Sequence, residues 1–201
     1  MSFTVDLLAA FILFAFVSSI TPGPNNTMLL ASGVNFGFRR SIPHALGVSI
    51  GFMLMVLAVG LGLGAVFKAV PMAYTVLRYA GAAYLLYLAY RIATSGPMRA
   101  DGSDRERQPM SFLGAAAFQW VNPKAWVMAI GAITTYTPAD GYIANVFVVA
   151  LVFAIVNLPS VCVWVGCGTA LRRVLQERRW LLVFNGLMAA LLVASLYPLL
   201  Q

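Results

Sequence analysis

Six apolar stretches, each about as long as a lipid bilayer is thick, dominate this chain of 201 residues. A helix needs about 20 largely apolar residues to cross the hydrocarbon core of a membrane. Stretches near or above that length lie at residues 5–35, 41–67, 72–94, 111–136, 142–168 and 180–200. Only 9% of the residues are charged, which leaves too little polar surface for a water-soluble fold, and the period-two alternation of a membrane barrel is absent. The sequence therefore predicts an all-α integral membrane protein with six transmembrane helices.

Basic residues between these stretches predict the orientation in the lipid bilayer, because cytoplasmic loops carry an excess of Lys and Arg. Three alternate loops hold most of them: Arg39, Arg40, Arg91, Arg99, Arg105, Arg107, Arg172, Arg173, Arg178 and Arg179. The opposite side holds Lys68 and Arg78. We therefore expect a cytoplasmic linker at about residues 96–110 and both termini outside the cytoplasm. The net charge of +7 reflects this topology, so no nucleic acid partner is expected.

The first apolar stretch contains a cluster of residues that oppose helix formation. As one straight helix its 31 residues would be about 46 Å long, against about 30 Å of hydrocarbon. Near its centre the sequence reads SSITPGPNNTM, which contains Pro22, Gly23, Pro24, Asn25 and Asn26. Each proline removes a backbone donor, while Asn25 and Asn26 are suited to cap a helix that restarts. We therefore expect a break in the first transmembrane helix near mid-membrane.

The fourth stretch has a similar interruption at its centre, formed by Asn122, Pro123 and Lys124. Asn122 suits the N-cap and Pro123 the first position of a restarting helix. The two motifs lie about 100 residues apart, and each opens a half with three stretches. Because three is odd, the halves enter the membrane in opposite directions. This pattern predicts one transmembrane domain over residues 1–201, made of two inverted three-helix repeats, about 1–95 and 111–201, with discontinuous first and fourth spans.

Broken helices at this depth indicate a polar site, because irregular backbone is tolerated there only where it faces protein or a wet cavity. The N-terminus of a half-helix favours a carboxylate, and unwound carbonyls favour an ammonium. An amino acid zwitterion carries both charges. The predicted substrate-binding residues are therefore those of the two motifs: Pro22, Gly23, Pro24, Asn25, Asn26, Asn122, Pro123 and Lys124.

Lys124 sharpens this prediction, because an ammonium at the membrane centre costs at least about 2.5 kcal/mol. No Asp or Glu lies in the core of any of the six stretches. Lys124 must therefore face water, bond to backbone carbonyls, meet an anionic substrate or lose its proton. A structural lysine that stabilises the broken helix is the alternative to a role in transport. For Asn25, Asn26 and Asn122 the alternative to substrate binding is helix capping.

Other polar and small residues in the spans have simpler interpretations. Asn157 and Pro159 predict a kink in the fifth span, with a polar contribution to the pathway as the alternative. His44, at the cytoplasmic start of the second span, is expected at the membrane interface. Gly47 and Gly51 are spaced to let helix backbones approach closely.

Three segments together resemble the lysine-exporter (LysE/RhtB) family of amino acid exporters: ITPGPNNTMLLASGVNFGFRRS, RYAGAAYLLYLAYRIATS and FQWVNPKAWVMAIGA. The similarity covers nearly the whole chain, and GVNFGFRRS and SFLGAAAFQWVNPK look most like the cysteine/O-acetylserine exporter branch. The resemblance implies a secondary transporter that exports amino acids across the bacterial inner membrane, driven by the proton or charge gradient. It also carries the two family motifs over to this chain, as Pro22, Gly23, Pro24 and Asn25, and as Asn122, Pro123 and Lys124.

The sequence departs from the family pattern in the second span. Many members carry an acidic residue early in that span, whereas residues 47–56 read GVSIGFMLMV. A preference for a cationic substrate is therefore not expected. A neutral or thiol-bearing amino acid, or a close derivative, fits better.

Other functional classes fit the sequence less well. His44 is the only histidine, so no H-E-x-x-H zinc motif occurs, and neither an enzyme nor a cofactor or metal is expected. Cys162 and Cys167 lie away from both breaks, which disfavours a thiol electron conduit. A passive channel for small polar solutes stays open as an alternative, because half-helices with Asn-Pro also build pores. A homo-oligomer is compatible with all of these features.

The predicted topology is tested by fusing reporters to the C-terminus. Alkaline phosphatase, which folds only outside the cytoplasm, should be active there, and a fused green fluorescent protein should stay dark. The reverse pattern would place the basic loops outside and contradict the orientation.

Overall fold

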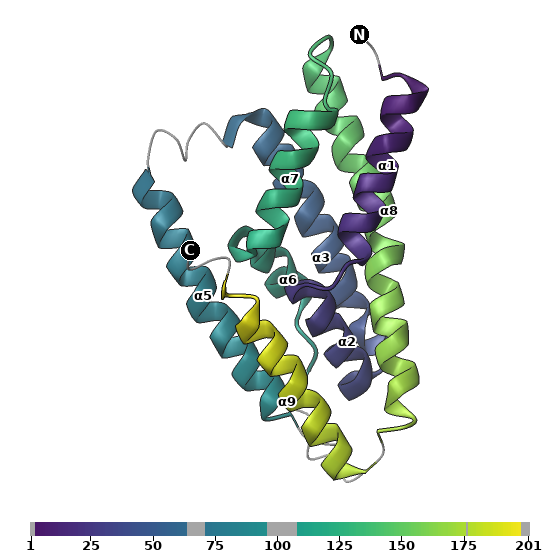
Figure 1. Cartoon of the computed structure of the whole chain (residues 1–201), viewed down its shortest axis with the longest axis vertical. Helices are drawn as coiled ribbons and strands as arrows, with labels where there is room; N and C mark the ends of the chain where they lie inside the picture. Colours follow the sequence, from purple (N-terminus) through teal and green to yellow (C-terminus); the bar gives the residue numbers. More distant parts are fainter. Residues whose placement is uncertain (1–2, 64–70, 96–107, 176, 198–201) are drawn as a thin grey trace.

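The computed structural model describes residues 3–63, 71–95, 108–175 and 177–197, and every regular element within them is a helix (Figure 1). This confirms an all-α chain for the described residues. Lys68, Arg99, Arg105 and Arg107 lie outside them, as does the side chain of Arg78.

The predicted break in the first stretch is confirmed. Helix α1, Val5–Ile20, ends just before Pro22, and α2, Pro24–Phe36, restarts after it. The two helices are bent by 54° at this break. The bend follows from the sequence, because the two prolines lack the backbone donors that would continue α1.

The interruption of the fourth stretch is confirmed as well. Helix α6, Phe112–Phe118, tightens into one 3₁₀ turn, η3, Gln119–Val121, which ends at Asn122. Helix α7, Pro123–Tyr136, starts at the next residue. The 3₁₀ turn and the proline at the first position of α7 together separate the two half-helices.

The remaining helices are longer and less interrupted. Helix α3, Phe38–Ala58, continues as a wider turn η1, Val59–Leu63, and α5 is Pro71–Ala93. Helix α8, Tyr142–Arg172, runs through Pro159 as one helix, and α9 is Arg178–Ala194. Among the described residues, α3 with η1 and α8 are each long and apolar enough to cross a membrane, and the bent α1–α2 pair is a third candidate.

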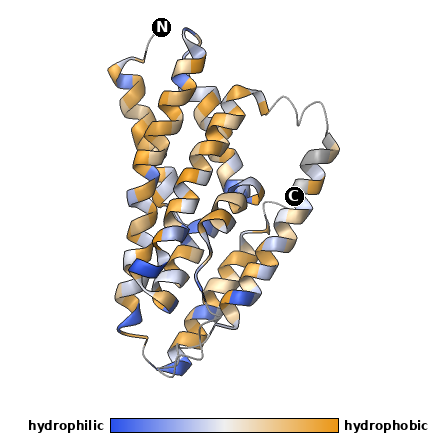
Figure 2. Ribbon diagram, turned by 180° about the vertical axis from the view of Figure 1, so that it is seen from behind, coloured by the Kyte–Doolittle hydropathy of each residue, from blue (hydrophilic) through white to orange (hydrophobic). Residues whose placement is uncertain are grey.

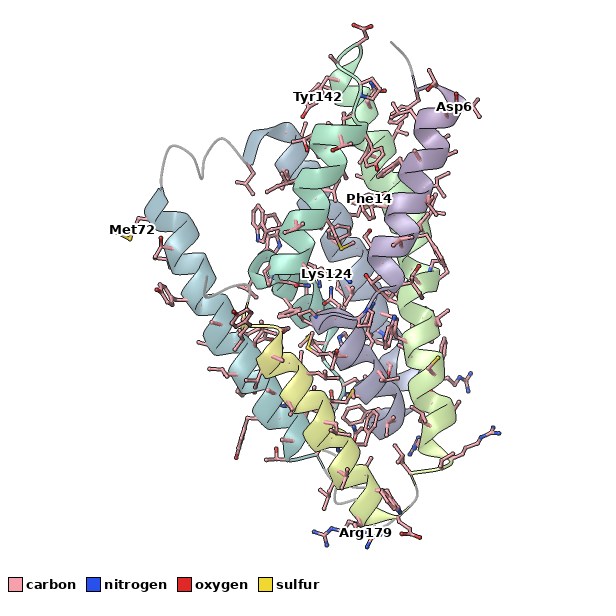
Figure 3. The ribbon with its side chains drawn as sticks, viewed as in Figure 1. Asp6, Phe14, Met72, Lys124, Tyr142 and Arg179 are labelled. Carbon is pink, nitrogen blue, oxygen red and sulfur yellow. The ribbon has the colours of Figure 1, made fainter. Side chains whose placement is uncertain are left out.

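The two broken segments run in opposite directions (Figure 1). Helices α1 and α2 descend in that view, whereas α7 rises from the level of the break. The start of α3, the end of α8 and the start of α9 lie at the lower end of Figure 1. We call it the basic end, because Arg39 and Arg40 lie in the first turn of α3, Arg172 ends α8, and Figure 3 labels Arg179 there. Figure 2 shows hydrophilic residues there and at mid-height, while apolar residues cover most of the helices. Asp6 and Tyr142 mark the opposite end in Figure 3.

Glycines bring the backbones of neighbouring helices into contact. A Cβ on Gly168 of α8 would overlap the Leu30 carbonyl oxygen of α2 and lie 3.1 Å from the Cα of Gly33. Gly47 and Gly51 of α3 are packed in the same way against α6, next to the backbone of Phe112 and Ala116. The packing role predicted for Gly47 and Gly51 is thus confirmed.

The contact at Gly168 can be tested against Gly166, which lies in the same helix and has open space on the side where a Cβ would point, with no neighbouring atom within 4 Å. Gly168→Ala should destabilise the protein by about 1–3 kcal/mol, because α2 and α8 must separate. Gly166→Ala should be neutral or slightly stabilising, because alanine favours a helix more than glycine does. Thermal unfolding of both variants in detergent measures the difference. Equal unfolding temperatures would show that the contact carries no stability.

Candidate functional site

The C-terminal end of α1 lies inside the bundle, where its free carbonyls need hydrogen-bond donors. Side chains supply them. Asn26 Nδ2 donates to the carbonyl oxygens of Ser19 (2.8 Å) and Thr21 (2.7 Å). The indole nitrogen of Trp164, on α8, donates to the carbonyl of Ile20 (3.0 Å). The break in the first span is therefore held by donors from α2 and α8.

Lys124 adds a further donor to this end of α1 from the second half of the chain (Figure 3). Its Nζ lies 2.8 Å from the carbonyl oxygen and 2.9 Å from the hydroxyl of Thr21, and 3.3 Å from the carbonyl oxygen of Pro22. Of the four environments expected for this lysine, the structure shows the bond to backbone carbonyls. The C-terminal end of a helix favours a cation through its dipole. Gly23 leaves room for this approach, because a Cβ there would lie 2.8 Å from Lys124 Cδ.

A pair of amides joins the two breaks directly. Asn25 Nδ2 donates to Gln119 Oε1 (2.8 Å), and Gln119 Nε2 donates back to Asn25 Oδ1 (3.2 Å). Gln119 also donates to the carbonyl of Ala115 (2.8 Å), which fixes its side chain on α6. The start of α2 and the turn η3 are therefore tied together by the Asn25–Gln119 pair.

The capping predictions are partly confirmed. Asn122 is the N-cap of α7, and its side chain accepts from the backbone N–H of Lys124 (3.2 Å). The prediction that Asn25 and Asn26 cap the restarting helix is wrong, because the N-cap of α2 is Gly23, which provides no side-chain cap. With Pro24 at the first helical position, both asparagines lie inside the first turn of α2. Their amides instead serve the free carbonyls of α1 and the side chain of Gln119.

The two breaks enclose a small polar cavity of about 20 Å³. Five of the eight predicted residues are among those that line it: Gly23, Asn25, Asn26, Asn122 and Lys124. The other three are prolines at or beside the helix ends. A cavity of this size holds about one water molecule and is smaller than any amino acid. The cavity therefore has no room for an amino acid in this conformation.

Sequence reasoning missed several residues of the cavity wall. Gln119 is fully buried and Ser19 is 3% exposed, and both line the cavity. Asn157 of α8 also lines it and donates to the Ser19 hydroxyl (3.1 Å). Its two interpretations, a kink and a polar contribution to the pathway, stay predictions. Gln119 lies three residues before Asn122 in an apolar stretch, and that isolated amide is a signal that could have identified it.

Aromatic side chains pack between this cavity and the end that carries Asp6. Phe153 of α8 meets Phe11 of α1 and Phe52 of α3 edge to face, with ring centroids 5.4 and 4.9 Å apart. Phe14 stacks on Tyr136 at 5.2 Å. Figure 3 shows Phe14 above Lys124, so this aromatic cluster closes the site on the side away from the basic end.

A larger cavity of about 570 Å³, here called the vestibule, lies between α2, α5 and α6 toward the basic end. His44 lines it and is only 2% exposed. His44 lies more than one turn into α3, which begins at Phe38, and its position relative to the membrane interface stays a prediction.

The geometry tests two features that occur in enzymes, a G-x-S-x-G serine motif and a metal site. Residues 47–51 spell G-x-S-x-G, but Ser49 is buried within α3 and donates to the carbonyl of Ala154 (3.2 Å). A catalytic serine of this motif needs an exposed strand-to-helix turn. Within the described residues, no group of three or more His, Cys, Asp or Glu side chains is placed to hold a metal ion.

Comparisons with known proteins identify the family of this chain. A family described as "LysE type translocator" matches residues 16–195. The cysteine/O-acetylserine efflux proteins of Escherichia coli (strain K12) and Shigella sonnei (strain Ss046) are each 34% identical to this chain over 177 residues, which is 87% of this chain and 88% of each relative. No solved structure matches. The family match confirms the resemblance seen in the sequence and makes the protein a membrane transporter, not an enzyme. The chain belongs to the LysE type translocator family.

Proposed function

We propose that this protein exports small neutral or thiol-bearing amino acids, or close derivatives such as O-acetylserine, across the bacterial inner membrane by alternating access. The observation that carries this proposal is the meeting of two broken helices, with the Lys124 ammonium on the free end of α1. The efflux proteins similar to this chain are named for cysteine and O-acetylserine. Both compounds are small zwitterions without a net positive charge.

The proposed substrate site is formed by the two motifs: Pro22, Gly23, Pro24, Asn25, Asn26, Asn122, Pro123 and Lys124. The N-termini of α2 and α7 both face the small cavity and favour the carboxylate of the substrate. The free carbonyls of Thr21 and Pro22 favour its ammonium. In the closed state the Lys124 ammonium occupies these carbonyls.

This arrangement suggests an exchange of charges during transport. When a zwitterion enters, its ammonium takes the place of Lys124 on the carbonyls of Thr21 and Pro22. The released Lys124 then pairs with the substrate carboxylate. The site keeps one cation on the end of α1 in both states, so neither state leaves a buried charge without a partner.

Two inverted repeats are the proposed basis of the motion, and the helix contacts support them. Helix α8 packs along both halves of the first broken span, α1 and α2, and α3 packs along both halves of the fourth, α6 and α7. Exchanging the two repeats converts the first set of contacts into the second. The third and sixth helices, α5 and α9, pack on each other, and the same exchange turns this pair into itself. With the basic end in the cytoplasm, the six helices place both termini outside.

In this scheme the structure represents an empty transporter, closed at the site and open toward the cytoplasm. The aromatic cluster blocks the outer side, and the vestibule lies on the inner side. Substrate must part the Asn25–Gln119 pair to pass from the vestibule into the site, and must then separate the aromatic cluster to leave.

A passive channel is the alternative, and counterflow distinguishes it from a carrier. Proteoliposomes preloaded with unlabelled O-acetyl-L-serine should accumulate labelled O-acetyl-L-serine from a dilute external solution, and the initial rate should saturate. Alternating access produces this result because each conformational cycle exchanges one bound molecule for another. Flux that is linear in concentration, with no transient accumulation, would identify a channel.

Replacing Lys124 tests the site itself. Lys124→Ala should abolish efflux while the protein still inserts into the membrane, because the ammonium that exchanges with the substrate is gone. Transport into inverted vesicles and yield of monodisperse protein in detergent measure the two effects separately.

Trp164→Phe provides the matched control, since it removes a different donor from the same end of α1. It should lower stability by about 1–3 kcal/mol, the cost of an unsatisfied buried acceptor, and leave measurable efflux. If both variants lose transport in proportion to their stability, Lys124 is a structural lysine only.

A further inference from the structure

The vestibule has two polar helix faces that look into the same space. Ser32 and Asn35 contribute from successive turns of α2, together with Met28. Tyr84 and Arg91 contribute from one face of α5, seven residues apart. A cavity of about 570 Å³ between such faces is large enough for an amino acid with several water molecules.

Several polar groups on these walls already have partners. The hydroxyls of Ser32 and Ser41 lie 2.7 Å apart, and Asn35 Nδ2 donates to Asn185 Oδ1 (2.9 Å). His44 differs. It is 2% exposed, and neither of its ring nitrogens has a hydrogen-bond partner among the described residues. Both nitrogens are buried, so a ligand reaches them once the imidazole turns into the vestibule, and there it offers one donor and one acceptor.

Arg91 provides the charge that selects such a ligand. It is the one charged side chain among the described residues that line the vestibule. A guanidinium binds a carboxylate through two parallel hydrogen bonds. A zwitterion satisfies both features, because it brings a carboxylate for Arg91 and further donors and acceptors for His44.

We propose that the vestibule is a second substrate site, in which a small zwitterionic amino acid docks on Arg91 and His44 before it reaches the broken helices. This inference rests on the proposed function and adds a site to it. The two cavities share no lining residue. Along α2 they are one turn apart, since Asn25 lines the first and Met28 the second. The Asn25–Gln119 pair, which joins α2 to η3, therefore separates the vestibule site from the broken-helix site.

The vestibule site can be probed without transport, by protection of a cysteine from a maleimide. The reporter is Tyr87→Cys in a chain that also carries Cys162→Ser and Cys167→Ser, because Tyr87 lines the vestibule and is 50% exposed. O-acetyl-L-serine, which has no thiol, should slow labelling several-fold. 2-Aminoethyl acetate, which lacks only the carboxylate, should not.

Met72→Cys in the same background is the control reporter. Met72 lies on α5, is 69% exposed and does not line the vestibule. Its labelling rate should not respond to either compound. Equal protection of both reporters would show a general effect on the protein and overturn the vestibule site.

Variants of the two docking residues test the assignment. Arg91→Gln, added to the Tyr87→Cys reporter, should raise the concentration for half-protection about tenfold or more, since it removes a charge-assisted pair. Arg91→Lys should give a smaller rise, because it keeps the charge and loses the second hydrogen bond. His44→Phe should also raise it, and size-exclusion chromatography shows whether each variant is folded. Unchanged protection in folded Arg91→Gln and His44→Phe would overturn the assignment.

Lys124→Ala distinguishes the two sites. Protection of Tyr87→Cys should persist in Lys124→Ala, because this variant still binds substrate in the vestibule although it cannot transport it. Loss of protection there would mean that labelling reports on the broken-helix site, and the second site would be refuted. Transport of O-acetyl-L-serine by a chain whose Tyr87→Cys reporter is never protected would overturn the vestibule site alone. Absence of both transport and protection would overturn the proposed substrate together with it.

Discussion

The structure depends on how a helix end is accommodated inside a membrane protein. Hydrocarbon offers no hydrogen bonds, so every free carbonyl at the end of α1 must find a donor within the protein. Each unsatisfied group would cost about 1–3 kcal/mol, and several lie together between Ser19 and Pro22. Asn26, Trp164 and Lys124 supply the donors. Their positions in turn determine how α2, α8 and α7 meet at the centre of the bundle.

The same requirement connects the two halves of the chain. Lys124 and Gln119 belong to the fourth stretch, yet their partners Thr21 and Asn25 belong to the first. A break in one half is therefore stabilised by the other half. Asn26 and Lys124, which stabilise the break, also line the small cavity, so in the proposed mechanism the same side chains serve structural support and substrate binding. This explains why both interpretations of Lys124, structural and functional, are reasonable from the sequence.

Local features of the structure can be predicted from the sequence, and long-range pairings cannot. Pro22, Pro24 and Pro123 determine the helix breaks through covalent geometry, which acts within a few residues. The N-cap of α7 at Asn122 follows from the same local rules. The pairing of Asn25 with Gln119 spans 94 residues, and that of Trp164 with Ile20 spans 144. Such partners depend on how helices pack, and an indole in an apolar stretch is equally suited to packing alone. The burial of His44 beside the vestibule depends on helix packing in the same way.

Helix α8 contacts the first span on both sides of its break. Near its middle, Asn157 and Trp164 bond to the last turn of α1, and further along Gly168 lies against the backbone of α2. Because α8 is unbroken and contacts both pieces, it restrains their orientation relative to each other. In the proposed transport cycle we therefore expect the angle between α1 and α2 to stay nearly constant. The broken span would then move together with α8, and the amide pair between α2 and η3 would be the contact that parts.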